Sequence, residues 1–418
     1  MTRLKGWVFP MVRIVKLPLM STTLQIQAHV LHVSAKTNWV FIEVKSSNGQ
    51  SGWGEASLIG WEPMLVAATR ELAQEWEGKP LADAQAGLRV SPQSPGGLVF
   101  NAVISGVHQA LASLLAAPDP YSQASSEAKA AAPNAADALA GPALRQSVPL
   151  YANINRATQV RTPQGFVDTA LRARAQGFSR FKAAPFDGLT PTLCGTMQGQ
   201  ALIRHGVDCM LALRDALGPD ALLMVDCHWR FDEARALQAL RDLAPVALHW
   251  FECPIAETHA HWQAIRRLRT ATRDQGVLLA AAETQVGLAS FQTLFDEALY
   301  DVVMPDVKYC GGPLEMLKIA QRASDHGVQF SPHNPSGPVC TWHSLQVAAL
   351  APECTMLELQ FDESALYDEV IEGSPLPMKD ACLTLSRPYE RVLALKAQVL
   401  QAHPYQPVPP GIETQLNR

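Results

Sequence analysis

The stretch Leu222-Leu223-Met224-Val225-Asp226 is a short apolar run that ends in a carboxylate. The same arrangement returns further along the chain, each time ending in an ionisable residue: Leu248-His249-Trp250-Phe251-Glu252, Leu279-Ala280-Ala281-Ala282-Glu283, Val302-Val303-Met304-Pro305-Asp306 and Gln329-Phe330-Ser331-Pro332-His333. The final residues are 26, 31, 23 and 27 positions apart, which fits one strand plus one helix. Apolar runs that alternate with amphipathic stretches are typical of a parallel sheet buried on both faces.

The whole set of such runs predicts eight strands: Val148–Ile154, Ser179–Ala184, Leu222–Cys227, Leu248–Cys253, Val277–Glu283, Asp301–Asp306, Val328–His333 and Thr355–Gln360. Amphipathic segments such as Phe231–Leu243 and Pro313–His326 lie between them. This number of strands favours an α/β fold of the β/α-barrel type over an open sheet. The C-terminal strand ends of a barrel meet at one face, so residues far apart in the sequence would surround one cavity.

Residues 1–146 lack this repeat and predict a smaller α+β domain. Its expected elements are strands at Trp7–Val15, Thr23–Val33 and Trp39–Lys45, a hairpin turn at Ser47–Gln50, and helices at Glu62–Trp76 and Asn101–Ala116. Within it, residues 117–143 are rich in Ala, Ser and Pro and predict a flexible surface insertion. We place the barrel at residues 147–370 and expect the irregular segment 371–418 to pack back on the first domain.

The composition excludes several classes of protein. Of 418 residues, 48% are apolar and 17% are charged, which excludes a disordered chain or a coiled coil. The net charge of −5 argues against a nucleic acid or a membrane surface as partner. The eight cysteines form no C-x-x-C pair, and we expect neither a targeting signal in Met1–Met20 nor a transmembrane helix. The sequence therefore predicts a cytoplasmic protein with reduced thiols.

Carboxylates end three consecutive runs at Asp226, Glu252 and Glu283. A single carboxylate at a strand end commonly caps the next helix or stays solvated. Three of them at one barrel face would repel one another unless a cation lies between them. Hard oxygen ligands favour Mg²⁺, with Mn²⁺ as an alternative, so we predict a metal site at these residues.

Histidines and a lysine end neighbouring runs. His333 follows Asp306 by one strand, and a carboxylate beside an imidazole fixes its tautomer and raises its basicity, as a general base requires. His228 lies two residues after Asp226, on the same side of the strand, and is a candidate general acid. Lys182 is a candidate electrophile or second base. The alternatives are a structural histidine at 333, a histidine of the cavity wall at 228, and a lone lysine without a catalytic role at 182.

These residues, together with several short motifs, resemble the enolase superfamily, specifically the mandelate racemase group that includes acid-sugar dehydratases. The motifs that carry the resemblance are Gly52-Trp53-Gly54-Glu55, Met304-Pro305-Asp306, Gly311-Gly312 and Ser331-Pro332-His333-Asn334. The resemblance implies a (β/α)7β modified TIM barrel beneath an α+β capping domain that the C-terminal segment completes. It also implies a small-molecule carboxylate substrate and a homo-oligomer, with no nucleic-acid or membrane partner.

The resemblance assigns roles to the candidate residues. The metal ligands of the family correspond to Asp226, Glu252 and Glu283, and its His-Asp dyad to His333 and Asp306. Asp226-Cys227-His228 matches the Asp-x-His of galactonate-type dehydratases. The implied reaction is removal of the proton α to a carboxylate by His333 and loss of the β-hydroxyl with help from His228, giving a 2-keto-3-deoxy acid. Lys182 would contact the substrate carboxylate or the leaving group, and Glu358 would hydrogen-bond a carboxylate oxygen of the intermediate.

Two departures from the family pattern bear on the reaction. The second strand of the family often carries Lys-x-Lys, whereas here Ala184 follows Lys182 by two residues. The stretch Gln109-Ala110-Leu111-Ala112-Ser113 stands where the family carries an Ala-Leu-Trp-Asp-like sequence. Two alternatives remain: a racemase or epimerase that uses Lys182 and His333 as bases on opposite faces, and a non-catalytic metal-binding barrel. The resemblance also implies that loops of the capping domain set specificity, here those near Leu17–Thr23 and Ala56–Trp61.

Overall fold

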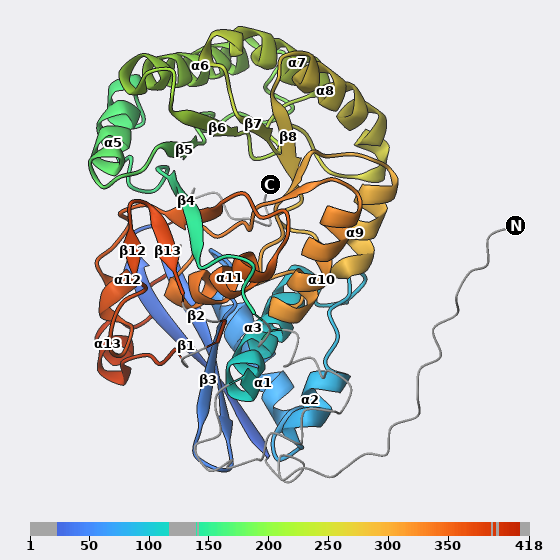
Figure 1. Ribbon diagram of the computed structural model, residues 1–418, viewed down its shortest axis with the longest axis vertical. Coiled ribbons are helices and arrows are strands. Elements are labelled where there is room, and N and C mark those ends of the chain that lie inside the picture. The colour runs from blue at the N-terminus through green and yellow to red at the C-terminus, as the bar shows by residue number, and fades with distance from the viewer. Residues whose placement is uncertain (1–22, 117–138, 140–141, 386–387, 390–392, 410–418) are drawn as a thin grey trace, which may run out of the picture.

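The computed structural model describes residues 23–116, 139, 142–385, 388–389 and 393–409 (Figure 1). The predicted strand Trp7–Val15, nearly all of the predicted 117–143 insertion and nearly all of the predicted loop Leu17–Thr23 lie outside the described residues.

The N-terminal domain is an antiparallel sheet covered by helices. Strands β1 (Leu24–Ser34), β2 (Thr37–Ser46) and β3 (Ser51–Glu55) pair in that order, and helices α1 (Glu62–Trp76), α2 (Leu81–Gly87) and α3 (Gly97–Ala116) follow. The predicted hairpin turn joins β2 to β3, where Gly49 has φ 88° and donates its N–H to Ser46 O at 2.9 Å. The sequence predicted α1 and α3 but not the short helix α2.

Helix α3 lies directly against β3. A Cβ atom on Gly52 would come within 2.1 Å of the carbonyl oxygen of Ala110, and one on Gly54 within 1.9 Å of that of Gly106. The motif Gly-Trp-Gly therefore permits a contact between strand and helix backbones that larger residues would prevent. In the described residues, α3 is also the one helix long and apolar enough to cross a membrane, and 67% of that stretch is buried within the protein.

The second part of the chain alternates strands and helices. Its elements are β4 (Ser147–Asn153), α5 (Pro163–Ala175), β5 (Arg180–Ala183), α6 (Met197–Leu217), β6 (Leu222–Asp226), α7 (Glu233–Asp242), β7 (Trp250–Glu252), α8 (Trp262–Asp274), β8 (Leu278–Ala281), α9 (Gly287–Asp296), β9 (Val302–Val303), α10 (Gly312–Asp325), β10 (Gln329–Phe330), α11 (Pro338–Leu350) and β11 (Leu357–Gln360). Short 3-10 turns lie at Ala244–Val246 and His259–His261.

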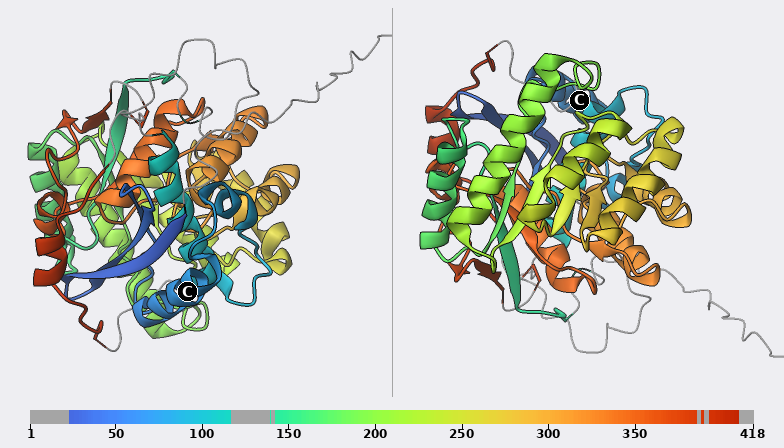
Figure 2. Two further views of the ribbon diagram at one scale, coloured as in Figure 1. Left: turned by 90° about the horizontal axis from the view of Figure 1, so that it is seen from below. Right: turned by 90° about the horizontal axis from the view of Figure 1, so that it is seen from above.

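These strands form the predicted barrel. Strands β4 to β10 pair with their neighbours in chain order and in parallel, and β11 returns to pair in parallel with β4. In the described part of the chain this makes seven β/α units and a final strand, which confirms the (β/α)7β fold. The helices form an outer layer around the strands (Figures 1 and 2).

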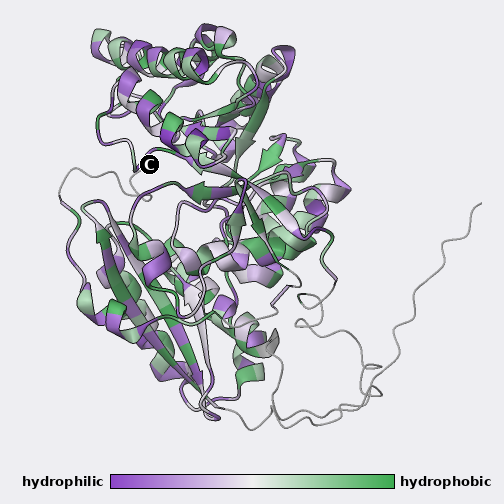
Figure 3. Cartoon of the chain, turned by 60° about the vertical axis from the view of Figure 1, so that its left-hand side comes forward, coloured by the Kyte–Doolittle hydropathy of each residue, from purple (hydrophilic) through white to green (hydrophobic). Residues whose placement is uncertain are grey.

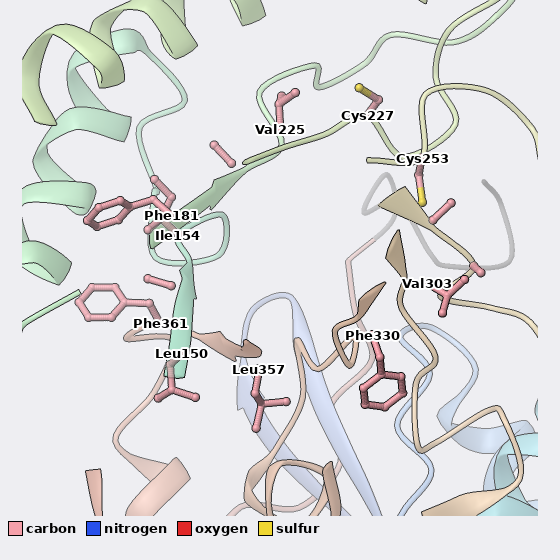
Figure 4. Close-up of a cluster of buried hydrophobic side chains, with 14 of the residues drawn as sticks. Leu150, Ile154, Phe181, Val225, Cys227, Cys253, Val303, Phe330, Leu357 and Phe361 are labelled. Atoms are coloured by element: carbon pink, nitrogen blue, oxygen red, sulfur yellow. The ribbon is translucent and has the colours of Figure 1, made fainter. Parts of the chain in front are cut away.

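Successive side chains of each barrel strand point alternately outward and inward, which gives one apolar layer outside the strands and another inside the barrel. Outward-facing side chains such as Phe181, Val225 and Cys253 pack in the layer between strands and helices (Figure 4). Inward-facing residues, including Met224 and Trp250, fill the barrel interior. The strands are accordingly mostly hydrophobic, whereas the helices carry both kinds of residue (Figure 3). Because successive side chains alternate, a residue two positions after an inward one also points inward, toward the barrel mouth.

The C-terminal segment divides between the two domains. Its elements are α12 (Leu366–Glu369), β12 (Met378–Lys379), β13 (Cys382–Thr384) and α13 (Ala397–Ala402). The hairpin of β12 and β13 pairs antiparallel with β4 of the barrel, which the sequence did not predict. The end of the segment lies on the N-terminal domain, where His403 O accepts from His32 N and Gln406 O from the side chain of Asn38, each at 2.9 Å.

His343 of α11 joins three parts of the chain and is fully buried. Its Nε2 is 2.9 Å from Trp53 O and its Nδ1 is 2.9 Å from the hydroxyl of Tyr389. Burial lowers the pKa of His343 from 6.5 to about 4. The folded state therefore disfavours the protonated imidazole more than the unfolded state does.

This depression predicts a pH dependence of stability. The unfolded chain takes up the proton as the pH falls below 6.5, whereas the folded chain does so only near 4. The free energy of unfolding should therefore be fully present above pH 6.5 and fall by roughly 3 kcal/mol toward pH 4. In His343→Gln the decrease over this range should be smaller by that amount, as measured by urea unfolding at several pH values. The same substitution at the exposed His326 is the control, and equal pH slopes in both variants would contradict this origin.

Candidate active site

The predicted site residues converge at one mouth of the barrel. The inward faces of β5, β6, β7 and β11 present Lys182, Asp226, Glu252 and Glu358 at this mouth. Glu283, Asp306 and His333 lie in the loops just beyond β8, β9 and β10. The contacts described below link these residues into one cluster, with side chains that are almost entirely buried.

Lys182 lies between two carboxylates. Its Nζ is 2.7 Å from Glu252 Oε1 and 3.0 Å from Glu358 Oε1, and its side chain is 1% exposed. Burial alone would lower the pKa of Lys182, but Glu252 and Glu358 outweigh this effect and hold the pKa well above its ordinary value. Lys182 is therefore an ammonium group, which can donate hydrogen bonds but cannot accept a proton.

Asp226 and Glu252 lie on adjacent strands and are paired in register across β6 and β7. A ligand oxygen of each lies within 4.8 Å of the other and of Cys253 Sγ. Burial raises the pKa of the Cys253 thiol well above its ordinary value, so the sulfur stays protonated and is a poor ligand for a hard cation. Glu283, the third predicted ligand, is not in this group of ligand atoms, and its Oε2 is 3.3 Å from His333 Nε2.

The charges of this cluster fit a divalent cation. Burial raises the pKa of Glu252 well above its ordinary value, and the negative charges of Asp226, Glu358 and Glu283 raise it further against the opposing effect of Lys182. A cation near these oxygens would reverse that balance. All three predicted ligands are carboxylates and none is a histidine, a set that suits Mg²⁺ better than zinc.

His333 and Asp306 form a direct pair. His333 Nδ1 is 2.8 Å from Asp306 Oδ2, and both side chains are buried. Burial would raise the pKa of Asp306, but Lys308 and His333 together lower it, so the carboxylate is ionised. An ionised Asp306 accepts the proton on Nδ1 and leaves Nε2 facing the barrel mouth.

His228 turns back onto Asp226. Its Nε2 is 2.7 Å from Asp226 Oδ2, and its backbone N–H donates to Asp226 Oδ1 at 2.9 Å. The turn requires a φ of 49° at His228, a left-handed conformation that non-glycine residues adopt rarely. With 15% of its side chain exposed, His228 is more accessible than Lys182 or His333.

Residues 165–388, more than half of the chain, match the family described as Enolase C-terminal domain-like. The chain belongs to the enolase superfamily. It is 26% identical over 277 residues to a D-gluconate dehydratase of Thermoproteus tenax, a match that covers 66% of this chain and 54% of that protein. It is also 26% identical over 324 residues to a D-galactonate dehydratase of Variovorax paradoxus, covering 77% of this chain and 78% of that protein.

Solved structures share this fold. The mandelate racemase/muconate lactonizing enzyme from Jannaschia sp. CCS1 has a TM-score of 0.74 and 18% identity, and the match covers 94% of this chain and 100% of that one. This likeness shows that the fold is shared along nearly the whole chain. The named relatives support an enzyme, and two of them are dehydratases of sugar acids.

Lys308 is a member of the site that the sequence analysis missed. Its Nζ is 2.6 Å from Asp306 Oδ2, the same oxygen that contacts His333, and it also donates to Ser336 Oγ. Burial would lower the pKa of Lys308, but Asp306 raises it well above its ordinary value. Lysine side chains usually point to solvent, so the sequence offered little reason to place Lys308 in the site. The one available indication was its position two residues after Asp306.

Glu358 has hydrogen-bond donors on both oxygens. Asn153 Nδ2 donates to Oε1 at 2.7 Å, and the backbone N–H of Asn334 donates to Oε2 at 2.8 Å. Burial would raise the pKa of Glu358, but Lys182 and the other neighbours lower it. The carboxylate therefore anchors Lys182 and the backbone of Asn334, and its hydrogen bond to an intermediate stays a prediction.

Glu55 links the N-terminal domain to the loop that carries His333. Its carboxylate accepts from the backbone N–H groups of Gly337 and Cys340 at 2.9 and 3.0 Å, at the start of α11. A Cβ atom on Gly337 would approach Glu55 Oε2 to 2.8 Å, so this contact requires glycine. A carboxylate at a helix N-terminus is stabilised by the helix dipole. The motif that ends in Glu55 was noted in the sequence, but this role was not predicted.

Proposed function

We propose that this enolase-superfamily protein is a Mg²⁺-dependent dehydratase of a sugar acid that forms a 2-keto-3-deoxy acid. The observation that carries the proposal is the presence of two histidines with different partners at one barrel mouth. His333, beyond β10, is paired with an ionised Asp306. His228, beyond β6, contacts Asp226 at the end of that strand. A base with a separate acid permits β-elimination of water, and the named dehydratase relatives agree with this reaction.

In this proposal Asp226, Glu252 and Glu283 hold Mg²⁺. The ion would supply positive charge beside the substrate carboxylate, which stabilises the negative charge that develops when the α-proton leaves. His333 takes that proton at Nε2, since its Nδ1 is occupied by Asp306. His228 gives a proton to the departing β-hydroxyl, and Lys182 binds the substrate as a charged donor. The burial of these side chains keeps bulk water away from the reacting groups.

Racemisation is the alternative reaction, and the geometry of Lys182 does not favour it. A two-base reaction would require Lys182 to lose its proton. Its contacts with Glu252 and Glu358 stabilise the ammonium form instead. The residue two positions later is Ala184, which cannot titrate.

The test is a screen of mono- and diacid sugars with Mg²⁺, in which products are identified by NMR in D₂O. A dehydratase should form a 2-keto-3-deoxy acid from at least one substrate and lose its activity with EDTA. Epimer formation with label in both epimers and no keto acid would replace the dehydratase by a racemase or epimerase. Mg²⁺ binding without α-proton exchange on any acid would indicate a non-catalytic barrel.

A further inference from the structure

The loops that follow β6 and β7 and precede Glu283 contain strained backbone. Trp229 has φ 56°, Cys253 has φ 45° and Ala282 has φ 82°, all in the left-handed region. Each is within three residues of a proposed metal ligand, and Cys253 and Ala282 are directly adjacent to one. Such conformations cost about 1–3 kcal/mol each at non-glycine residues and persist only where other contacts hold them.

One carboxylate contacts all three of these residues. Glu257 Oε1 accepts from Trp229 Nε1 at 2.8 Å, from Ala282 N at 3.3 Å and from Cys253 Sγ at 3.6 Å. Glu257 Oε2 accepts from Gln285 Nε2 at 3.3 Å, two residues beyond Glu283. Glu257 therefore joins the loops that present Asp226, Glu252 and Glu283, although it lies outside the group of ligand atoms formed by Asp226, Glu252 and Cys253.

Among the residues that the structure describes, backbone hydrogen bonds join each of these loops to the neighbouring strand or loop only. Trp229 N donates to Cys253 O at 2.6 Å, which ties the β6 loop to the β7 loop, and Cys253 N donates to Ala280 O at 2.9 Å, within the sheet. The strained peptide at Ala282 instead donates its N–H to the Glu257 side chain. Loss of that side chain would leave this N–H and the Trp229 indole without their acceptor, while the barrel strands kept their pairing.

We propose that Glu257 is a positioning residue that fixes the spacing of the three metal-ligand loops. It is not one of the proposed metal ligands, and it acts by holding Trp229, Cys253 and Ala282 in their left-handed conformations. The inference about the loops stands on these contacts alone. Its consequence for metal affinity rests on the metal site of the proposed function.

The experiment compares Glu257→Ala and Glu257→Gln with Glu315→Ala. Glu315 is a matched control because its Oε1 likewise accepts a backbone N–H, that of Leu288 at 3.0 Å, on the helical side of the barrel. Amide hydrogen exchange of segments 227–231, 252–257 and 280–285 is measured in metal-free protein. Mn²⁺ affinity is measured by calorimetry with the metal alone.

Glu257→Ala should speed exchange in all three segments and weaken Mn²⁺ binding by roughly 10–100-fold. Glu257→Gln keeps an acceptor oxygen and should stay close to the wild type in both measurements, as should Glu315→Ala. Unchanged exchange in Glu257→Ala, or equal effects of Gln and Ala, would overturn the proposal. If the wild type itself bound no Mn²⁺, the proposed metal site would fail, but the exchange data would still decide the role of Glu257.

Discussion

Replacing His333 with asparagine is expected to abolish both α-proton exchange and keto-acid formation. General bases contribute about 10²–10⁴-fold to such reactions, so turnover should fall by at least that range. Asparagine retains a group that can face Asp306 but has no nitrogen able to take a proton. The protein should stay folded, because the ion pair of Asp306 with Lys308 remains. Exchange is followed by NMR in D₂O with the substrate found in the screen.

The companion variant, His228→Asn, should separate the two chemical steps. It removes the proposed acid but leaves His333 and Asp306 in place, so dehydration should be lost while exchange with deuterium continues. His326→Asn, an exposed change just after α10, is the control and should keep both activities. Exchange at the wild-type rate in His333→Asn would show that another group takes the proton. Lys182 would then have to give up the contacts with Glu252 and Glu358 that keep it charged.

The barrel was predictable because its strands leave a simple signal. Strands buried on both faces are continuous apolar runs, and each of the eight runs overlaps a strand in the described residues. Apart from β4, which is as long as its run, the strands are shorter than the runs. Val302–Val303 and Gln329–Phe330 end before Asp306 and His333, which lie in the loops that follow. The sequence thus predicted which side chains meet at one mouth of the barrel, although not the exact ends of its strands.

The remainder of the site depends on contacts that no local pattern encodes. Lys308 and Glu257 are charged residues in loops, where solvent exposure is the ordinary expectation. Their partners come from other loops, and Glu55 reaches the start of α11 from another domain. The β12–β13 hairpin also escaped prediction, because its strands of two and three residues carry too little alternation to detect. Tertiary pairing with β4, rather than local sequence, defines them.

Replacing Glu252 with glutamine should remove the stabilisation that Mg²⁺ gives to the folded protein. In the wild type, Mg²⁺ at about 100 times its dissociation constant should add about 2.7 kcal/mol to the free energy of unfolding. The variant loses one of the charged oxygens that a hard cation prefers, so neither this gain nor measurable Mg²⁺ binding by calorimetry should remain. Turnover should be abolished with it, since Glu252 also holds Lys182.

Without metal, the same variant should be about as stable as the wild type or more stable. The substitution removes a charge that burial and the neighbouring carboxylates disfavour, which offsets the loss of one acceptor oxygen. The amide oxygen can accept from only one of the two donors that Glu252 holds, Lys182 Nζ at 2.7 Å or Trp250 Nε1 at 3.0 Å, but Lys182 keeps Glu358 at 3.0 Å. Glu315→Gln should retain the full Mg²⁺ response and serves as the control. Equal stabilisation by Mg²⁺ in Glu252→Gln and the wild type would place the cation away from this cluster. A large loss of stability without metal would show that the main role of Glu252 is to stabilise the buried Lys182.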